Sequence, residues 1–263
     1  MVFITGDIHG DPSRFSIDEF PTQNEMTKED YVIICGDFGM LWSLNENKKE
    51  NERLDWLNNR NFTTLFVDGN HENFDRLNSY PVKEWHGGKV HFIRNSIIHL
   101  MRGEIYDING SSFFAFGGAR SHDIRGFATF EETKKDYTAG ILQPNDPHFI
   151  GKLSLANRYG ISVRVEGETW WRAELPTKNE MEYGISNLKK HHNKVDYIIT
   201  HDGPISDLIL VSDRHITSDP VNQYFEKVKQ HTKYKGWYFG HHHMDKDVNR
   251  TEHAIYERIV QIM

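Results

Sequence analysis

Five short apolar runs, each stopped by glycine, aspartate or histidine, constrain the fold of this 263-residue chain most strongly. The runs read "VFIT", "YVIIC", "TTLFV", "DYIIT" and "GWYF", and they precede "GDIHG", "GDFG", "DGNHE", "HDGP" and "GHHH". Each is four or five residues long and rich in β-branched and aromatic residues, which is typical of buried strands. Helix-like segments at 48–61 and 179–194 lie between some of the runs, and this alternation predicts an α/β layered fold.

The middle of the chain has a different pattern. Residues 89–119 predict consecutive short strands with turns at "RG" and "NGSS". Residues from about 120 to 178 no longer show the pattern of short apolar runs that is typical of strands. Because the motifs on both sides of them belong together, we interpret 120–178 as an insertion in a single domain that spans residues 1–263.

Composition bears on the location of the protein. No stretch approaches the roughly 18 consecutive apolar residues that a membrane span needs. The first residues, "MVFITGDIHG", lack the basic region of a signal peptide. The single cysteine, Cys35, suits a reducing compartment. We therefore expect a cytoplasmic protein with no membrane partner.

The net charge of −7 bears on the ligands. An acidic chain releases few counterions from a polyphosphate, so we do not expect a long nucleic acid as the partner. A local binding site can still carry a net positive charge in an acidic chain. Nothing in the sequence predicts an oligomeric state.

Side chains that bind metal ions follow the apolar runs. In open α/β sheets the active site lies beyond the carboxyl ends of the strands, so these loops gather at one edge if the strands are parallel neighbours. Carboxylates, imidazoles and an amide oxygen suit Mn²⁺, Fe or Zn²⁺ better than Mg²⁺. The side chains of this kind are Asp7, His9, Asp37, Asn70, His71, His201, His241 and His243.

The histidine run at 241–243 raises the question of which rings face the site. Alternate side chains of an extended segment face the same way. His241 and His243 can therefore point into one site while His242 points away. The same argument pairs Asp7 with His9.

The motifs "GDIHG", "GDFG", "GNHE", "TH" and "GHHH", in this order, resemble the signature of the calcineurin-like metallophosphoesterase superfamily. The match spans positions 7 to 243. The segments "GGARSHDIRG" and "WWRAELP" are similar to those of an uncharacterised bacterial and phage branch, whose substrate does not follow from the resemblance. The fold implied is the four-layer α/β/β/α sandwich of metallo-dependent phosphatases.

The resemblance also implies a division of roles, which we state for this chain's own residues. One divalent cation is implied to be bound by Asp7, His9 and His243. A second cation is implied to be bound by Asn70, His201 and His241, and Asp37 is implied to bridge the two cations. His71 is implied to be the general acid, which protonates the leaving oxygen.

The chemistry implied is phosphoester hydrolysis by a metal-dependent enzyme in which metal-bound hydroxide attacks phosphorus. We expect Mn²⁺ in both positions, with Fe, Zn²⁺ and Ni²⁺ as alternatives. Two such cations outweigh the charges of Asp7 and Asp37. An anionic ester is therefore attracted in spite of the acidic chain.

One motif departs from the protein phosphatases of this superfamily. Their second block reads G-D-x-V-D-R-G, whereas this chain has "GDFGMLW", with Met40 and Trp42 in place of Asp and Arg. The change disfavours a protein phosphatase and leaves His71 without its usual carboxylate. Glu72 or a residue of the insertion could replace it. Candidate phosphate-binding residues are Arg76, Arg120 and Arg125, because Arg can hold phosphate oxygens in a bidentate way.

The substrate expected is a small or medium-sized phosphate ester, with monoester and diester both open. We favour a phosphodiester or a nucleotide, because the phosphatase Arg is absent and aromatic residues lie in the insertion. Trp170 and Trp171 could stack on a base, or could pack the insertion onto the core. The charged run at 45–55 is interpreted as an exposed helix face. The alternative function is a non-catalytic metal- or nucleotide-binding module of the same fold.

Overall fold

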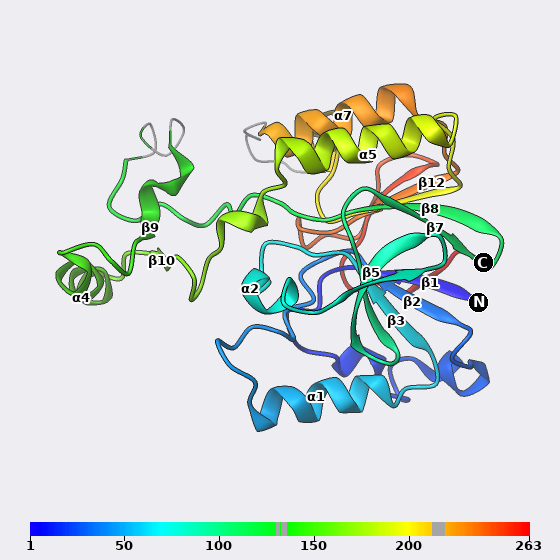
Figure 1. The fold of residues 1–263 in the computed structure, drawn as a ribbon, viewed down its shortest axis with the longest axis horizontal. Coiled ribbons are helices and arrows are strands. Elements are labelled where there is room, and N and C mark those ends of the chain that lie inside the picture. Colours follow the sequence, from blue (N-terminus) through cyan, green and yellow to red (C-terminus); the bar gives the residue numbers. More distant parts are fainter. Residues whose placement is uncertain (130–131, 133–135, 212–218) are drawn as a thin grey trace.

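Two mixed β-sheets face each other in the computed structural model, which describes residues 1–129, 132, 136–211 and 219–263 (Figure 1). The first sheet has the strand order β15-β1-β2-β3-β6-β5-β4. Its strands are β1 (Val2–Thr5), β2 (Tyr31–Ile34), β3 (Thr63–Phe66), β4 (Val82–Trp85), β5 (Gly88–Arg94), β6 (Ile97–Leu100) and β15 (Val260–Gln261). The second sheet has the order β13-β14-β12-β11-β8-β7. Its strands are β7 (Glu104–Ile108), β8 (Ser111–Phe116), β11 (Tyr197–Thr200), β12 (Gly236–Phe239), β13 (Lys246–Asp247) and β14 (Glu252–Ala254).

Helices cover the outer faces of both sheets (Figure 1). On the first sheet lies α1 (Lys48–Asn58), and on the second lie α5 (Lys178–Lys190) and α7 (Pro220–His231). Two shorter helices, α2 (Phe74–Leu77) and α6 (Ile205–Val211), follow β3 and β11. The chain is thus an α/β protein, as predicted.

Strand periodicity explains the layers. In β1, Val2 and Ile4 join the core between the sheets, while Phe3 joins the core beneath α1. In β8, Phe113 lies in the core between the sheets, while Phe114 packs toward α5 and α7. Because both faces of these strands are buried, their sequences are apolar throughout rather than alternating.

The predicted elements are largely confirmed. The segments at 48–61 and 179–194 form α1 and α5, and 89–119 forms β5 to β8. The side chain of Asn47 caps α1 by accepting a hydrogen bond from the Glu50 amide at 3.0 Å. None of the described helices is both long enough and apolar enough to cross a membrane.

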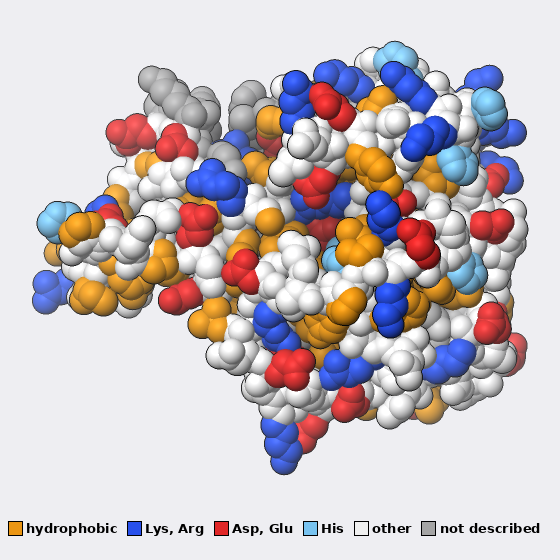
Figure 2. Space-filling model, viewed as in Figure 1, with side chains coloured by type: hydrophobic (Ala, Val, Ile, Leu, Met, Phe, Trp, Pro, Cys, Tyr) orange, Lys and Arg blue, Asp and Glu red, His pale blue; other side chains and the backbone are white. Residues whose placement is uncertain are grey.

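The segment at 120–178 contains little regular structure. It holds the two-residue strands β9 (Ile141–Leu142) and β10 (Arg164–Val165), which pair with each other, and the helix α4 (Phe149–Tyr159). In Figure 1 these elements lie to one side of the two large sheets, and Figure 2 shows apolar side chains exposed there. Its description as an insertion in a single domain stays a prediction.

The two tryptophans of this segment are buried. The Trp171 indole donates a hydrogen bond to Asp75 Oδ2 at 2.8 Å and packs edge-on against Trp42. Only 1% of Trp170 is exposed. Both rings therefore pack the segment against its surroundings and offer no open face for stacking on a base.

Candidate metal centre

The candidate ligands converge from the carboxyl ends of five strands. In the first sheet β1, β2 and β3 are parallel neighbours, and in the second β11 and β12 are parallel neighbours. The loops that follow them meet where the sheets face each other. The structure brings together Asp7, His9, Asp37, Asn70, His201, His241 and His243.

One half of the centre is formed by the first and last of these loops. His243 Nε2 lies 3.3 Å from Asp7 Oδ2 and 2.9 Å from His9 Nε2. His9 Nε2 lies 3.8 Å from an oxygen of Asp37. Asp7, His9 and His243 form one group whose ligand atoms lie within 4.8 Å of one another.

The other half lies deeper. His201 Nε2 is 3.3 Å from Asp37 Oδ1 and 3.2 Å from Asn70 Oδ1. His241 completes a second group with Asp37 and His201. Asp37 thus lies between the two halves, as a bridging carboxylate would.

An unpartnered nitrogen shows that the site fits a cation. The Nε2 atom of His241 is buried and has no hydrogen-bond partner among the described residues. A buried polar atom without a partner costs about 1–3 kcal/mol. A cation bound beside Asp37 and His201 would give this lone pair a partner. These buried histidines and aspartates can therefore hold a metal ion.

Contacts behind the ligands fix their orientation. His201 Nδ1 donates a hydrogen bond to the Cys35 carbonyl oxygen at 2.8 Å, which turns Nε2 toward the centre. The amide nitrogen of Asn70 donates to Ser121 Oγ at 3.2 Å, which leaves Oδ1 facing His201. Ser121 Oγ in turn donates to Glu174 Oε2 at 2.7 Å. Residues of the 120–178 segment therefore hold the candidate ligand Asn70 in place.

Four of the candidate ligands have left-handed backbone. The φ angles are 46° at His9, 46° at Asp37, 68° at His241 and 49° at His243. Non-glycine residues in sparsely populated regions cost about 1–3 kcal/mol each and persist only where the surroundings require them. Such strain is typical of functional sites.

This backbone corrects the expected reason for the histidine pattern. The segment at 241–243 is a tight turn rather than an extended strand, so the alternation argument was wrong. His241 and His243 reach the centre through left-handed backbone. His242 does turn away from it, and its Nε2 lies 2.9 Å from Asp202 Oδ1. His9 likewise joins Asp7 through a left-handed residue.

Glycines precede several ligands because the loops approach each other closely. A Cβ atom on Gly69 would lie 2.0 Å from Asp37 Oδ1, and one on Gly240 would lie 2.1 Å from Asp7 Oδ1. A Cβ on Gly36 would lie 2.1 Å from His201 Nδ1. The glycines of the sequence motifs thus make the convergence sterically possible.

The electrostatics of the centre favour positive charge. Burial alone would raise the pKa of Asp37, but His201, His71 and His9 together lower it below its ordinary value. Burial alone would lower the pKa of His201, but Asp37 and Asp7 raise it to about 10. Burial holds the pKa of His241 well below its usual range, so this ring stays neutral and able to bind a metal.

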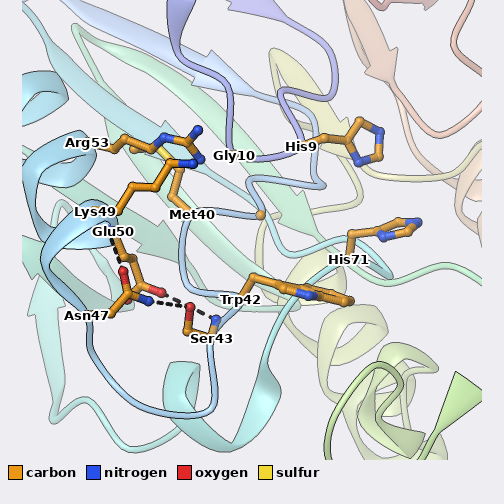
Figure 3. Close-up of a pocket in the computed structure, with 11 residues that line it drawn as sticks. His9, Gly10, Met40, Trp42, Ser43, Asn47, Lys49, Glu50, Arg53 and His71 are labelled. Atoms are coloured by element: carbon orange, nitrogen blue, oxygen red, sulfur yellow. Dashed lines mark hydrogen bonds between the residues drawn. The ribbon is translucent and has the colours of Figure 1, made fainter.

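A pocket of about 370 Å³ opens beside His9 and His71 (Figure 3). The rings of His9 and His71 lie 5.0 Å apart, and Trp42 lies 5.8 Å from His71. The pocket is lined by His9, Gly10, Gly39, Met40, Trp42, Ser43, Asn47, Lys49, Glu50, Arg53 and His71.

The arginines proposed for phosphate binding do not line this pocket. Arg76 Nη1 donates hydrogen bonds to Glu50 Oε2 at 2.8 Å and to the Ser43 carbonyl oxygen at 3.0 Å, so it braces the pocket wall from behind. Arg120 and Arg125 belong to the 120–178 segment and are absent from the described lining residues.

Glu72 does not support His71 in the manner considered from the sequence. Its carboxylate accepts hydrogen bonds from the amides of Phe38 and Gly39, at 2.7 and 3.2 Å. Glu72 therefore orders the loop that carries Asp37. Burial raises its pKa well above the usual range.

Sequence reasoning missed several residues around the centre. The ring of His122 lies 4.6 Å from that of His241, and His122 forms a further group with Asp202 and His241. Lys49 and Arg53 line the pocket, although their helix face was interpreted only as exposed. Their spacing of four residues, which places both on one face of a helix, was the available signal.

Searches against protein-family models and against curated proteins each gave no match.

The close approach at Gly69 gives a first prediction. Gly69→Ala places a methyl group against the Asp37 carboxylate and its amide, so we expect at least one bound Mn²⁺ to be lost. Gly151→Ala, where a Cβ meets nothing within 4 Å, is the control. Metal analysis after gel filtration measures the difference. Equal metal content in the two variants would contradict the prediction.

The buried Glu174 gives a second prediction, on stability against pH. Burial raises the pKa of this carboxyl from 4.5 to about 7. The folded state therefore binds the proton more tightly than the unfolded chain, and its free energy of unfolding falls as the pH rises from about 4.5 to about 7. We expect the free energy of unfolding of the wild type to fall by roughly 3 kcal/mol across this pH range. This fall should be absent in Glu174→Gln.

Urea unfolding with chelator present, at several pH values, measures this difference. Glu168→Gln, at an exposed position of the same segment, is the control and should keep the wild-type dependence. A Glu174→Gln variant with the same dependence as the wild type would show that the prediction is wrong.

Proposed function

We propose that the chain is a calcineurin-like metallophosphoesterase that hydrolyses a phosphate ester with two divalent cations. The observation that carries the proposal is the placement of Asp37 between two ligand groups, one with Asp7, His9 and His243 and one with His201 and His241. The unpartnered Nε2 of His241 supports a cation in the second group. The layer order of helix, sheet, sheet and helix supports the four-layer sandwich that the resemblance implies.

We assign Mn²⁺ to both positions, with Fe, Zn²⁺ and Ni²⁺ as alternatives, because the donors are imidazoles, carboxylates and an amide oxygen. Divalent cations bound here would act as Lewis acids toward phosphate oxygens and lower the pKa of water toward 7. The chain's own part is to hold the ligands. Asp7 and Asp37 provide the negative charge, and the hydrogen bonds at His201 and Asn70 set the direction of the donor atoms.

His71 is the candidate proton donor. Its backbone amide donates a hydrogen bond to Asp37 Oδ1 at 2.7 Å, which anchors it beside the centre. Its ring lines the pocket next to His9 and Trp42. In this position the imidazole can give its proton to the leaving oxygen of an ester held at the mouth of the centre.

The favoured substrate is a phosphodiester or a nucleotide. A pocket of about 370 Å³ is the size of a small-molecule site. Trp42, which replaces the protein-phosphatase Arg, gives this pocket an aromatic wall. A planar base can stack on such a face.

The test is a panel of phosphate esters offered to the Mn²⁺-loaded protein. It contains p-nitrophenyl phosphate, bis-p-nitrophenyl phosphate, and cyclic and linear nucleotides. We expect two equivalents of Mn²⁺ per chain and hydrolysis that a chelator abolishes. We also expect p-nitrophenol to be released faster from bis-p-nitrophenyl phosphate than from p-nitrophenyl phosphate. Two bound equivalents with no hydrolysis across the panel would instead indicate the non-catalytic binding module.

Substitution of the proton donor gives a further prediction. His71→Ala should keep both metal equivalents and slow turnover by roughly 10²–10⁴-fold, most strongly for poor leaving groups. The ligand atoms of His71, His9 and Asp37 also lie within 4.8 Å of one another, so a ligand role is the competing assignment. Loss of metal from His71→Ala would establish that competing role. His242→Ala is the control and should retain its metals.

A further inference from the structure

The pocket beside the metal centre has two chemically different ends. His9 and His71 form one end, and the side chains of Lys49 and Arg53 lie together at the other (Figure 3). The side chains of Lys49 and Arg53 both project from α1, four residues apart. The guanidinium of Arg53 lies close to the backbone that follows His9, because its Nη1 is 3.9 Å from where a Cβ on Gly10 would stand.

The side chains of Lys49 and Arg53 have no acidic partner in the part of the chain that the structure describes. No ion pair or hydrogen bond joins the side chain of Lys49 or Arg53 to another side chain of the described residues. The neighbouring Lys48 behaves differently, because its ammonium lies 3.7 Å from Glu52, four residues on. At the same spacing Lys49 faces Arg53, and like charges so placed repel each other.

The one acidic side chain among the lining residues does not neutralise them. Glu50 forms an ion pair with Arg76 and accepts a hydrogen bond from it at 2.8 Å. A second hydrogen bond, from the Ser43 amide at 3.3 Å, holds the same oxygen. Two positive charges therefore remain at this end of the pocket, in a chain whose net charge is −7.

We propose that Lys49 and Arg53 bind a second phosphate group of the substrate, while the scissile phosphate lies at the end formed by His9 and His71. This inference rests on the proposed function and narrows its substrate class. A guanidinium can bind a phosphate through two parallel hydrogen bonds, and a lysine adds a point charge. The enzyme then prefers esters that carry a second phosphate group, such as nucleoside bisphosphates, over nucleoside monophosphates.

The experiment compares substrates that differ by one phosphate group. Phosphate release from AMP and from adenosine 3′,5′-bisphosphate, which are both phosphate esters, is measured with Mn²⁺ for the wild type, for Lys49→Gln/Arg53→Gln and for Lys48→Gln. Glutamine keeps the helix propensity close to that of Lys and Arg. We expect the double variant to lower the kcat/KM for the bisphosphate relative to that for AMP by at least about tenfold, mainly through KM. Lys48→Gln should keep the wild-type ratio.

A binding measurement separates this inference from the proposed function. Calorimetric titration with inorganic pyrophosphate, with and without Mn²⁺, should show at least about tenfold weaker binding to the double variant and no change for Lys48→Gln. If the wild type hydrolyses no ester but pyrophosphate binding still depends on Lys49 and Arg53, the proposed function fails and the anion site stands. If hydrolysis proceeds while both the substrate ratio and pyrophosphate affinity are unchanged in the double variant, the anion site is overturned.

Discussion

The burial of two carboxylates among imidazoles is the interaction on which the rest of the centre depends. Asp7 and Asp37 are each only 1% exposed, and each is close to more than one histidine. Buried charges are costly unless they are paired or coordinate a metal. The raised pKa of His201 shows how strongly the carboxylates attract positive charge. Divalent cations bound here would compensate the negative charges of the same two carboxylates.

The fold provides this arrangement by placing the ends of two sheets against each other. Loops from β1, β2 and β3 meet loops from β11 and β12, and the amide of His241 donates a hydrogen bond to Asp7 Oδ1 at 3.0 Å across the junction. Small residues allow the approach, and left-handed residues turn the side chains inward. The 120–178 segment adds Ser121 and Glu174 behind Asn70, so it takes part in positioning the centre.

Part of this architecture could be predicted from the sequence for a clear physical reason. Buried strands have an apolar signature, and a polar residue directly after such a strand lies at the sheet edge, so Asp7, Asp37 and His201 were predicted from local patterns. The orientation at 241–243 was predicted for the wrong reason, because a tight left-handed turn leaves little trace in residue types. The spacing of Lys49 and Arg53 indicates a shared helix face, but their position beside the pocket depends on how α1 packs against a distant loop, which no local pattern encodes. Trp171 is likewise buried, and the tryptophan that lines the pocket is Trp42.

The central claim is that Asp37 holds two cations at once. A crystal grown with Mn²⁺ and measured for anomalous scattering tests it most directly. We expect two peaks about 3.5–4 Å apart, both bound by the Asp37 carboxylate, one also bound by Asp7 and His243 and the other by His201 and His241. A single peak that Asp37 does not contact, or no peak among these residues, would contradict it.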